Sequence, residues 1–209
     1  MTLKKGLKNY WGKFWFLLWK DDSLKGWIFS IVFLFIFIKF IFFPGLGLAT
    51  GTSLPLAIVE SCSMYHQGNL FSNFTAWYDR HDTKYAKFLI NGLDFQEFPM
   101  KNGFNKGDIL FIVRANPDKL EEGDIIIFNA NQRNPIIHRI VDIRETSNGR
   151  IFSTIGDNNN GQLSFENAIT EDMLVGKAAF KLAPYFGWVK LIFYDWQKPQ
   201  EERGLCQEN

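Results

Sequence analysis

Three short runs of the sequence carry residue types that could together hydrolyse an amide bond. A serine lies in the run SCSM at 61–64, a histidine in NPIIHRIV at 134–141 and an aspartate in GDNN at 156–159. A serine hydroxyl needs an imidazole to accept its proton, and the imidazole needs a partner that fixes its tautomer and stabilises its charged form. The sequence therefore offers Ser63 as the nucleophile, His138 as the general base and Asp157 as the acid.

Other residues compete for two of these roles. His66 and His81 could serve as the base, although His66 is very close to Ser63 in the sequence and His81 falls in a run of helical period. Cys62 could serve as the nucleophile, because a thiolate is more reactive than a hydroxyl. The chain has one other cysteine, Cys206, in an unrelated local setting. We therefore predict no disulfide and expect Cys62 to be a small residue beside the serine.

Short strands are expected to position the three runs. An apolar run at 54–59 leads into the serine, and segments 107–113 and 123–128 each join a Gly-Asp turn to a β-branched run of strand length. Segments 136–143 and 150–155 predict a hairpin, and 175–182 predicts a further strand. Strands at this spacing favour a mainly β fold, with an antiparallel domain that is twisted or barrel-like.

The stretch from 66 to 103 interrupts this pattern and is interpreted as an insertion. Aromatic residues and His81 recur every three or four positions from Phe71 to Phe88, which is the period of an amphipathic helix. The residues at 72–73 could cap its start, the Asn-Gly pair at 91–92 would end it, and a loop carrying 95–100 would follow. We expect the insertion to cover one side of the β domain; the alternative is that its aromatic stripe rests on a membrane.

Before the β domain the chain has a segment apolar enough to cross a membrane. The run WIFSIVFLFIFIKFIFFPGLGL occupies 27–48, and about 20 apolar residues suffice to span the hydrocarbon core. Lys39 must reach the interface from within this run, or the span ends nearer Phe43. The lysine-rich residues 1–26 are predicted to stay cytoplasmic and to include an interfacial helix, which places 49–188 outside. A cleaved signal would start earlier and be shorter, and a buried core helix is the other alternative.

Composition and charge narrow the function classes. The 209 residues carry a net charge of +1, and this balance does not indicate a protein that binds nucleic acid. The spacing of metal ligands and of phosphate-binding loops is missing, so we expect neither a metal nor an organic cofactor. Of the 22 Phe and 7 Trp, many lie within the first 43 residues, as is typical of membrane segments. The final segment 189–209 is too short to span and is predicted to be interfacial, with a polar tail.

The three runs, in this order behind an anchor, resemble the boxes of the type I signal peptidase family. SCSM resembles the serine box, usually Ser-x-Ser-Met, in which Cys62 takes the variable middle position; HRIV resembles the box of the general base, and GDNN the closing box. Bacterial members place lysine as the base, whereas the archaeal and endoplasmic-reticulum branch places histidine followed by arginine, as this chain does. The two Gly-Asp segments and the ending at 175–188 also follow the family's order. The resemblance covers roughly 54–188 without the insertion.

The resemblance implies a membrane-bound serine endopeptidase that cleaves N-terminal signal peptides from exported preproteins. It assigns catalysis to Ser63, His138 and Asp157, with the Ser63 N–H and the Ser61 hydroxyl as the oxyanion hole. The expected partners are signal peptides, the lipid bilayer and, as a further candidate, the secretion translocon. The expected location is the cell membrane, or the endoplasmic-reticulum membrane in a eukaryote, with a cytoplasmic N-terminus, a single span and an extracytoplasmic catalytic domain.

The chain departs from the family at the acid. Many members of this branch carry a second aspartate shortly after the GDNN box, whereas 160–166 contains none. Asp157 is our prediction for the acid; Glu166 or Ser164 could substitute, and a dyad is the remaining alternative. Three other functions stay open. They are a catalytically inactive, membrane-tethered accessory subunit that binds signal peptides, a self-cleaving repressor-type protease, which would carry a lysine base and a DNA-binding domain, and a thiol protease using Cys62.

Overall fold

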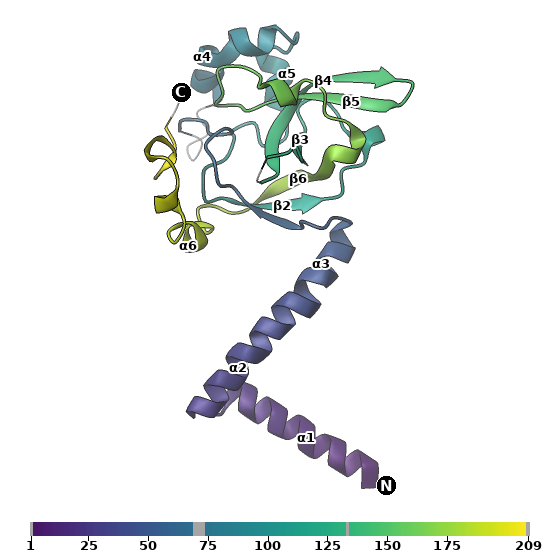
Figure 1. The fold of residues 1–209 in the computed structure, drawn as a ribbon, viewed down its shortest axis with the longest axis vertical. Helices are drawn as coiled ribbons and strands as arrows, with labels where there is room; N and C mark the ends of the chain where they lie inside the picture. The colour runs from purple at the N-terminus through teal and green to yellow at the C-terminus, as the bar shows by residue number, and fades with distance from the viewer. Residues whose placement is uncertain (1, 69–73, 133, 208–209) are drawn as a thin grey trace. The chain divides into compact units, whose positions relative to one another are not determined.

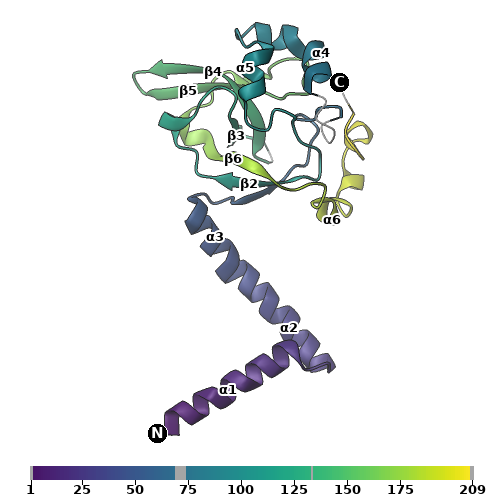
Figure 2. The ribbon, with the colours of Figure 1, turned by 180° about the vertical axis from the view of Figure 1, so that it is seen from behind.

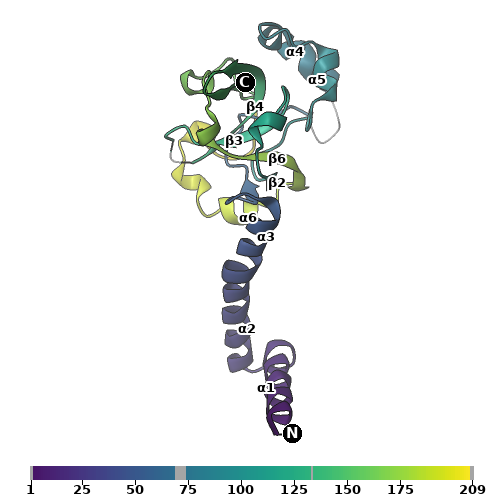
Figure 3. The same cartoon turned by 90° about the vertical axis from the view of Figure 1, so that its right-hand side faces the viewer.

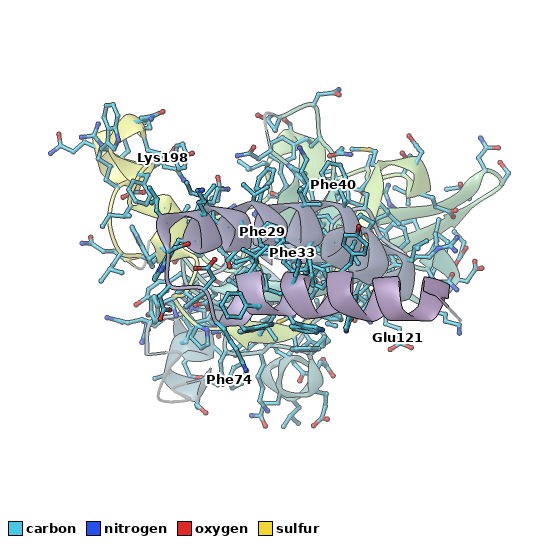
Figure 4. The ribbon with its side chains drawn as sticks, turned by 90° about the horizontal axis from the view of Figure 1, so that it is seen from below. Phe29, Phe33, Phe40, Phe74, Glu121 and Lys198 are labelled. Carbon is cyan, nitrogen blue, oxygen red and sulfur yellow. A yellow bond between two sulfur atoms is a disulfide. The ribbon has the colours of Figure 1, made fainter. Side chains whose placement is uncertain are left out.

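The computed structural model describes residues 2–68, 74–132 and 134–207, in two compact units, Met1–Ala49 and Thr50–Asn209. The first unit is helical (Figure 1). Helix α1 (Thr2–Trp19) precedes one continuous helix, which consists of α2 (Leu24–Phe37), the π-helical turn η1 (Ile38–Phe42) and α3 (Phe43–Thr50). The Phe14 ring of α1 lies edge-on to Phe29 and Phe33 of α2, with centroids 5.7 and 5.2 Å apart. Phe29 and Phe33 are labelled in Figure 4. Aromatic contacts therefore join the two helices of this unit.

The continuous helix contains the predicted apolar segment 27–48. Within the described part of the chain, Leu24–Thr50 is the one helix long and apolar enough to cross a membrane, a criterion of length and composition alone. Pro44 lacks an N–H, and a proline ring crowds the carbonyl four residues earlier in a regular helix. The π-helical turn directly before it widens the helix, and the Phe43 N–H bonds to the Ile38 carbonyl. The helix therefore accommodates Pro44 and continues past Phe43.

The second unit is built on a single antiparallel sheet of six strands, which confirms the predicted antiparallel β fold (Figures 1 and 2). The strand order is β1-β2-β6-β3-β4-β5, and β4 and β5 form the predicted hairpin. The strands are β1 (Leu56–Ile58), β2 (Ile109–Val113), β3 (Ile125–Phe128), β4 (Ile136–Thr146), β5 (Gly149–Ile155) and β6 (Leu174–Ala183). Short 3-10 turns lie between them at η3 (Pro117–Lys119), η4 (Ser164–Glu166) and η5 (Glu171–Met173).

Both faces of the sheet are covered at the central strand β3. Along β3, which is buried throughout, alternate residues enter different clusters: Ile125 and Ile127 join one, and Ile126 and Phe128 join another. This alternation is the two-residue period of a strand, and it explains why β3 is apolar at every position. Residues next to each other on a strand of this sheet therefore serve different layers of the domain.

The two Gly-Asp turns tie β2 and β3 to the central strand β6. The glycines, Gly107 and Gly123, have φ of 91° and 89°, in the left-handed region that favours glycine. In both turns the aspartate accepts the backbone N–H three residues earlier and forms an ion pair with a lysine of β6. The pairs are Asp108–Lys181 at 2.8 Å and Asp124–Lys177 at 2.6 Å. The sequence repeat thus corresponds to one structural device used twice.

The insertion contains two helices, where one helix and a loop were predicted. Helix α4 (Phe74–Ala86) is shorter than expected, and its predicted start at 71–73 lies outside the described residues. Helix α5 (Gly92–Glu97) replaces the first part of the predicted loop. Asn91 does not end α4; its side chain accepts the N–H groups of Leu93 and Asp94 and so begins α5. The two helices lie next to each other, at the opposite end of this unit from α6 (Figures 1 and 3).

Aromatic residues of the insertion form a cluster with the sheet. Trp77 and Tyr85 of α4 and Phe95 of α5 are fully buried, together with Val141 of β4 and Ile155 of β5. This packing agrees with the expectation that the insertion covers one side of the β domain.

The last part of the chain, residues 188–207, runs back along this unit and is called the C-terminal strap below. It includes α6 (Trp188–Leu191), η6 (Asp195–Gln197) and η7 (Gln200–Glu202), and exposes apolar side chains such as Phe193 and Trp196. Its interfacial position stays a prediction. The prediction of no disulfide is wrong: Cys206 of the strap is bonded to Cys62, with the Cα atoms 5.4 Å apart. The two residues are 144 positions apart in sequence, so no local pattern signals the pairing.

Candidate active site

A cleft of about 660 Å³ brings Ser61, Ser63 and His138 together. One side is formed by β1 and the residues after it, and another by residues 134–138, which lead into and begin β4. Apolar side chains such as Ile58, Ile137 and Phe165 make up much of the remaining lining. The predicted nucleophile and the predicted base therefore face one cavity, which is large enough for several residues of a peptide.

The loop 60–64, which follows β1, is fixed by backbone contacts and by a buried methionine. The Ser63 carbonyl accepts the N–H of Asn158 at 2.7 Å, and the Met64 carbonyl accepts the N–H of Phe104 at 3.0 Å. Met64 is 1% exposed and belongs to the cluster beneath β1 and β2. The hydroxyl oxygens of Ser61 and Ser63 lie 3.2 Å apart. The short strand and the buried Met64 thus hold the two serines at the cleft.

His138 lies in β4, is 4% exposed, and is held by Glu166. Its Nδ1 is hydrogen-bonded to Oε1 of Glu166, which is fully buried in η4. A buried carboxylate is tolerated where donors surround it. Glu166 also accepts the Leu163 N–H at 2.6 Å and the Thr154 hydroxyl at 3.4 Å. With Nδ1 engaged in this way, Nε2 is the ring nitrogen left to meet a serine hydroxyl.

Asp157 does not contact His138 in the described structure, and its carboxylate has other partners. Arg139 Nη2 donates to its Oδ2 at 2.7 Å, and Tyr85 donates its hydroxyl to Oδ1 at 2.9 Å. His66 Nε2 lies 2.9 Å from Oδ2. Burial alone would raise the pKa of Asp157, but the Arg139 charge and the hydrogen bonds from His66 and Arg139 hold it well below its usual range. Glu166, the alternative acid, and not Asp157 is therefore the carboxylate that contacts the imidazole of His138; a role of either carboxylate in catalysis stays a proposal.

The strand period explains why His138 and Arg139 have separate carboxylates. Neighbouring side chains on a strand point to opposite faces, so one carboxylate cannot serve both residues. Arg139 is fully buried on its own face and donates to the carbonyls of Pro99 and Gly123, each at 2.9 Å, as well as to Asp157. The His-Arg pair of the sequence therefore requires two buried acids on two sides of β4.

The insertion supplies further partners of the GDNN loop that were not predicted from the sequence. Lys84, on α4, donates from Nζ to the carbonyls of Asp157 and Asn159, the latter at 3.1 Å. His66 is stacked on the Trp77 ring, with centroids 3.4 Å apart, and burial lowers its pKa to about 4. The helical period placed Tyr85 on a buried face, but it gave no sign that Lys84 or His66 would reach this loop.

The competing candidates are placed away from the cleft or are chemically blocked. Among the residues described, neither His66 nor His81 lines the cleft, and His81 Nδ1 lies 2.7 Å from the Trp77 carbonyl oxygen. Cys62 is half of a disulfide and so has no thiol to ionise. Of the three candidates for the acid, Asp157, Ser164 and Glu166, none lines the cleft, and Glu166 is the one whose side chain is hydrogen-bonded to His138 in the described structure. Ser63 and His138 are the nucleophile and base candidates that share the cavity.

Comparison with known proteins relates part of the chain to signal peptidase subunits. It is 35% identical over 106 residues to the signal peptidase complex catalytic subunit SEC11C of Homo sapiens and of Canis lupus familiaris, a match that covers 47% of this chain and 55% of the relative. It is 31% identical over 107 residues to the subunit SEC11 of Colletotrichum graminicola, covering 47% of this chain and 62% of the relative. No family model matches the chain.

The chain thus spans about half the length of the mammalian relatives that it matches. Over the matched part, the similarity confirms the resemblance to the type I signal peptidase family, in its endoplasmic-reticulum branch. The match is between sequences and assigns no role to an individual residue.

Proposed function

We propose that this protein is a membrane-bound serine endopeptidase that cleaves N-terminal signal peptides from exported preproteins. One observation carries the proposal: Ser63 and His138 line a single cleft, and a buried carboxylate, Glu166, engages the Nδ1 atom of His138. The similarity to catalytic subunits of signal peptidase complexes supports the choice of substrate.

In the proposed mechanism the Ser63 hydroxyl attacks the carbonyl carbon of the scissile bond. His138 takes the hydroxyl proton on Nε2, while Glu166 at Nδ1 fixes the tautomer and stabilises the imidazolium. The oxyanion of the tetrahedral intermediate accepts the Ser63 N–H and the Ser61 hydroxyl, which lies 3.2 Å from the Ser63 oxygen. His138 then gives the proton to the departing amine. Water attacks the acyl-enzyme with His138 again acting as base.

Two free strand edges support binding of an extended substrate. Strand β1 is at the end of the sheet and pairs only with β2 among the described strands. Residues 136–138 of β4 pair with β3, whereas pairing between β4 and β5 begins at Arg139. Both segments line the cleft. A substrate strand could therefore add its backbone hydrogen bonds to one or both of these edges.

The proposed topology places the second unit outside the cytoplasm and leaves the lysine-rich residues 1–26 inside. The disulfide between Cys62 and Cys206 supports this orientation, because disulfides persist in oxidising compartments and are rare in the cytosol. By analogy with relatives that are named as subunits of a complex, we further propose that the chain works with partner subunits. Whether the protein lies in the plasma membrane or in the endoplasmic-reticulum membrane depends on the source organism.

The test is cleavage of a preprotein by the full chain in detergent or vesicles. We expect Ser63→Ala and His138→Ala to abolish cleavage while membrane insertion is retained. Ser63→Ala should also keep the melting temperature, whereas His138→Ala takes a partner from the buried Glu166 carboxylate and should lower it. His81→Ala is the matched control, since His81 is outside the cleft, and should leave cleavage unchanged. Full activity of Ser63→Ala would exclude this nucleophile. Absence of cleavage by the unaltered chain would favour the alternative, a catalytically inactive subunit that binds signal peptides.

A further inference from the structure

The C-terminal strap contacts the loop of the catalytic serine at several points. Cys206 is covalently bonded to Cys62, the residue directly before Ser63. Lys198 donates from Nζ to the Glu60 carbonyl, and Lys190 forms an ion pair with the Glu60 carboxylate at 3.1 Å. The residues on both sides of Ser61 are therefore attached to a segment that lies more than 120 positions further along the chain.

Asn158 connects the strap to the same loop a second time. Its side-chain nitrogen donates to the carbonyls of Cys62 and Gln207, at 3.1 and 3.0 Å, and its N–H donates to the Ser63 carbonyl. One residue thus bonds to the serine, to its neighbour and to the end of the strap. Loss of the strap would remove one of the acceptors that fix the Asn158 side chain.

A second set of contacts docks the strap on the buried Lys106. This side chain is 1% exposed; its Nζ forms an ion pair with Asp195 and donates to the Glu202 carbonyl at 2.6 Å. Trp188 donates its indole N–H to the Lys106 carbonyl at 3.0 Å, and the Lys106 ammonium lies 5.3 Å from the Trp188 ring. The strap is consequently held along its length, and the disulfide closes its far end on the serine loop.

We propose that the strap positions the nucleophilic serine through Cys62–Cys206 and Asn158, so that cleavage depends on the redox state of this disulfide. The inference rests on the proposed function for its catalytic consequence. Cys206 and Asn158 are positioning residues, because they act on Ser63 through the loop backbone. A shift of the nucleophile by about 1 Å can lower kcat by about 10²-fold, so even partial release of the loop is expected to be measurable.

The chemistry of the switch is thiol–disulfide exchange. Cys62 and Cys206 are both half-buried, so an external dithiol can approach the bond. A thiolate of the dithiol attacks one sulfur, its second thiol resolves the mixed disulfide, and two protein thiols form while the dithiol becomes a disulfide; two electrons and two protons pass to the protein. The chain has no other cysteine, so a reductant acts on this bond alone.

The experiment uses the full chain in detergent, with and without dithiothreitol, beside the variant Cys62→Ala/Cys206→Ala. Hydrogen exchange of the amides at 60–64 reports the loop, and cleavage of a preprotein gives kcat and KM. On reduction we expect faster exchange at 60–64 and a fall in kcat of about tenfold with KM changed less than twofold, both restored by reoxidation. The double variant should behave like the reduced protein and not respond to dithiothreitol. A general loss of fold would instead speed exchange throughout the sheet.

Unchanged exchange and unchanged kcat after complete reduction, verified by alkylation of both cysteines, would overturn the inference. A response of the double variant to dithiothreitol would do the same. The exchange measurement separates the two proposals: faster exchange in a chain that never cleaves preprotein would keep the positioning role of the strap and reject the protease. Cleavage that depends on Ser63 but not on the disulfide would keep the protease and reject the strap.

Discussion

Glu166→Gln should abolish most catalysis while leaving the fold intact. Glutamine has nearly the same shape as glutamate and can still accept one of the present hydrogen bonds, from Leu163 or from His138. It cannot stabilise an imidazolium by charge, and its amide can stabilise the wrong imidazole tautomer. Loss of an orienting carboxylate lowers kcat by about 10²–10⁴-fold, or about 3–5 kcal/mol of transition-state stabilisation. The free energy of unfolding should fall by only about 1–3 kcal/mol, for the charged hydrogen bond that is lost.

Asp157→Asn is the matched comparison, because it makes the same chemical change at the carboxylate predicted from the sequence. Asp157 is fully buried against Arg139, and breaking a buried pair by neutralising one partner costs about 3–5 kcal/mol of folding stability. Because Asp157 does not contact His138, kcat per folded molecule should fall by no more than about tenfold, through movement of the GDNN loop. Glu166→Gln should therefore lose far more activity than stability, and Asp157→Asn far more stability than activity.

The assay combines preprotein cleavage with thermal unfolding of each purified variant in the same detergent. Activity is expressed per folded molecule, so that loss of the fold is not counted as loss of chemistry. The reasoning is refuted if Asp157→Asn loses 10²-fold or more in kcat with an unchanged melting temperature while Glu166→Gln remains active. Loss of kcat in neither variant would favour a Ser63–His138 dyad.

Two further predictions concern the partners of Asp157. Lys84→Met should lower the free energy of unfolding by about 2–4 kcal/mol, because the Lys84 ammonium donates to the carbonyls of Asp157 and Asn159. The control is Lys87→Met, at an exposed position of the same insertion, which should change this free energy by less than about 0.5 kcal/mol in the same thermal unfolding experiments. Burial lowers the pKa of His66 to about 4, so the unfolded chain binds a proton at this residue below about pH 6.5 and the folded chain only near pH 4. The free energy of unfolding should therefore fall by up to about 3 kcal/mol as the pH is lowered from about 6.5 to about 4. In unfolding measurements, His66→Gln should flatten the plot of this free energy against pH over that range. An equally steep curve in His66→Gln would assign the pH dependence to another group.

The strands were predictable because their local signals agree with the fold. Each Gly-Asp pair signals a turn that glycine adopts easily, and the apolar run after it is buried at every position in β3 and at alternate positions in β2. The hairpin of β4 and β5 followed from its polar turn. The second helix of the insertion was missed because Asn91 and Gly92 suit the end of one helix and the beginning of another equally well. Only the packing of Phe95 into the aromatic cluster decides between these two uses.

The disulfide and the acid could not be predicted for a different reason: both depend on contacts between distant segments. Cys62 and Cys206 meet only because the strap returns to the serine loop. The choice between Asp157 and Glu166 depends on which carboxylate reaches which face of β4. The period of the strand implies that His138 and Arg139 need separate partners, but sequence does not reveal how far the chain bends between residues 157 and 166.

The insertion and the C-terminal strap, whose roles the sequence left open, both support the loop of Ser63. The insertion contributes His66, Lys84 and Tyr85 to the buried environment of Asp157, and the next residue, Asn158, bonds to the Ser63 carbonyl. The strap reaches the same loop through Cys62. A nucleophile on a flexible loop must be ordered at each turnover, whereas one held before the substrate arrives needs no such step. Since Ser63 follows a strand of only three residues, we expect these added elements, together with the sheet and the buried Met64, to supply the rigidity that the proposed catalysis requires.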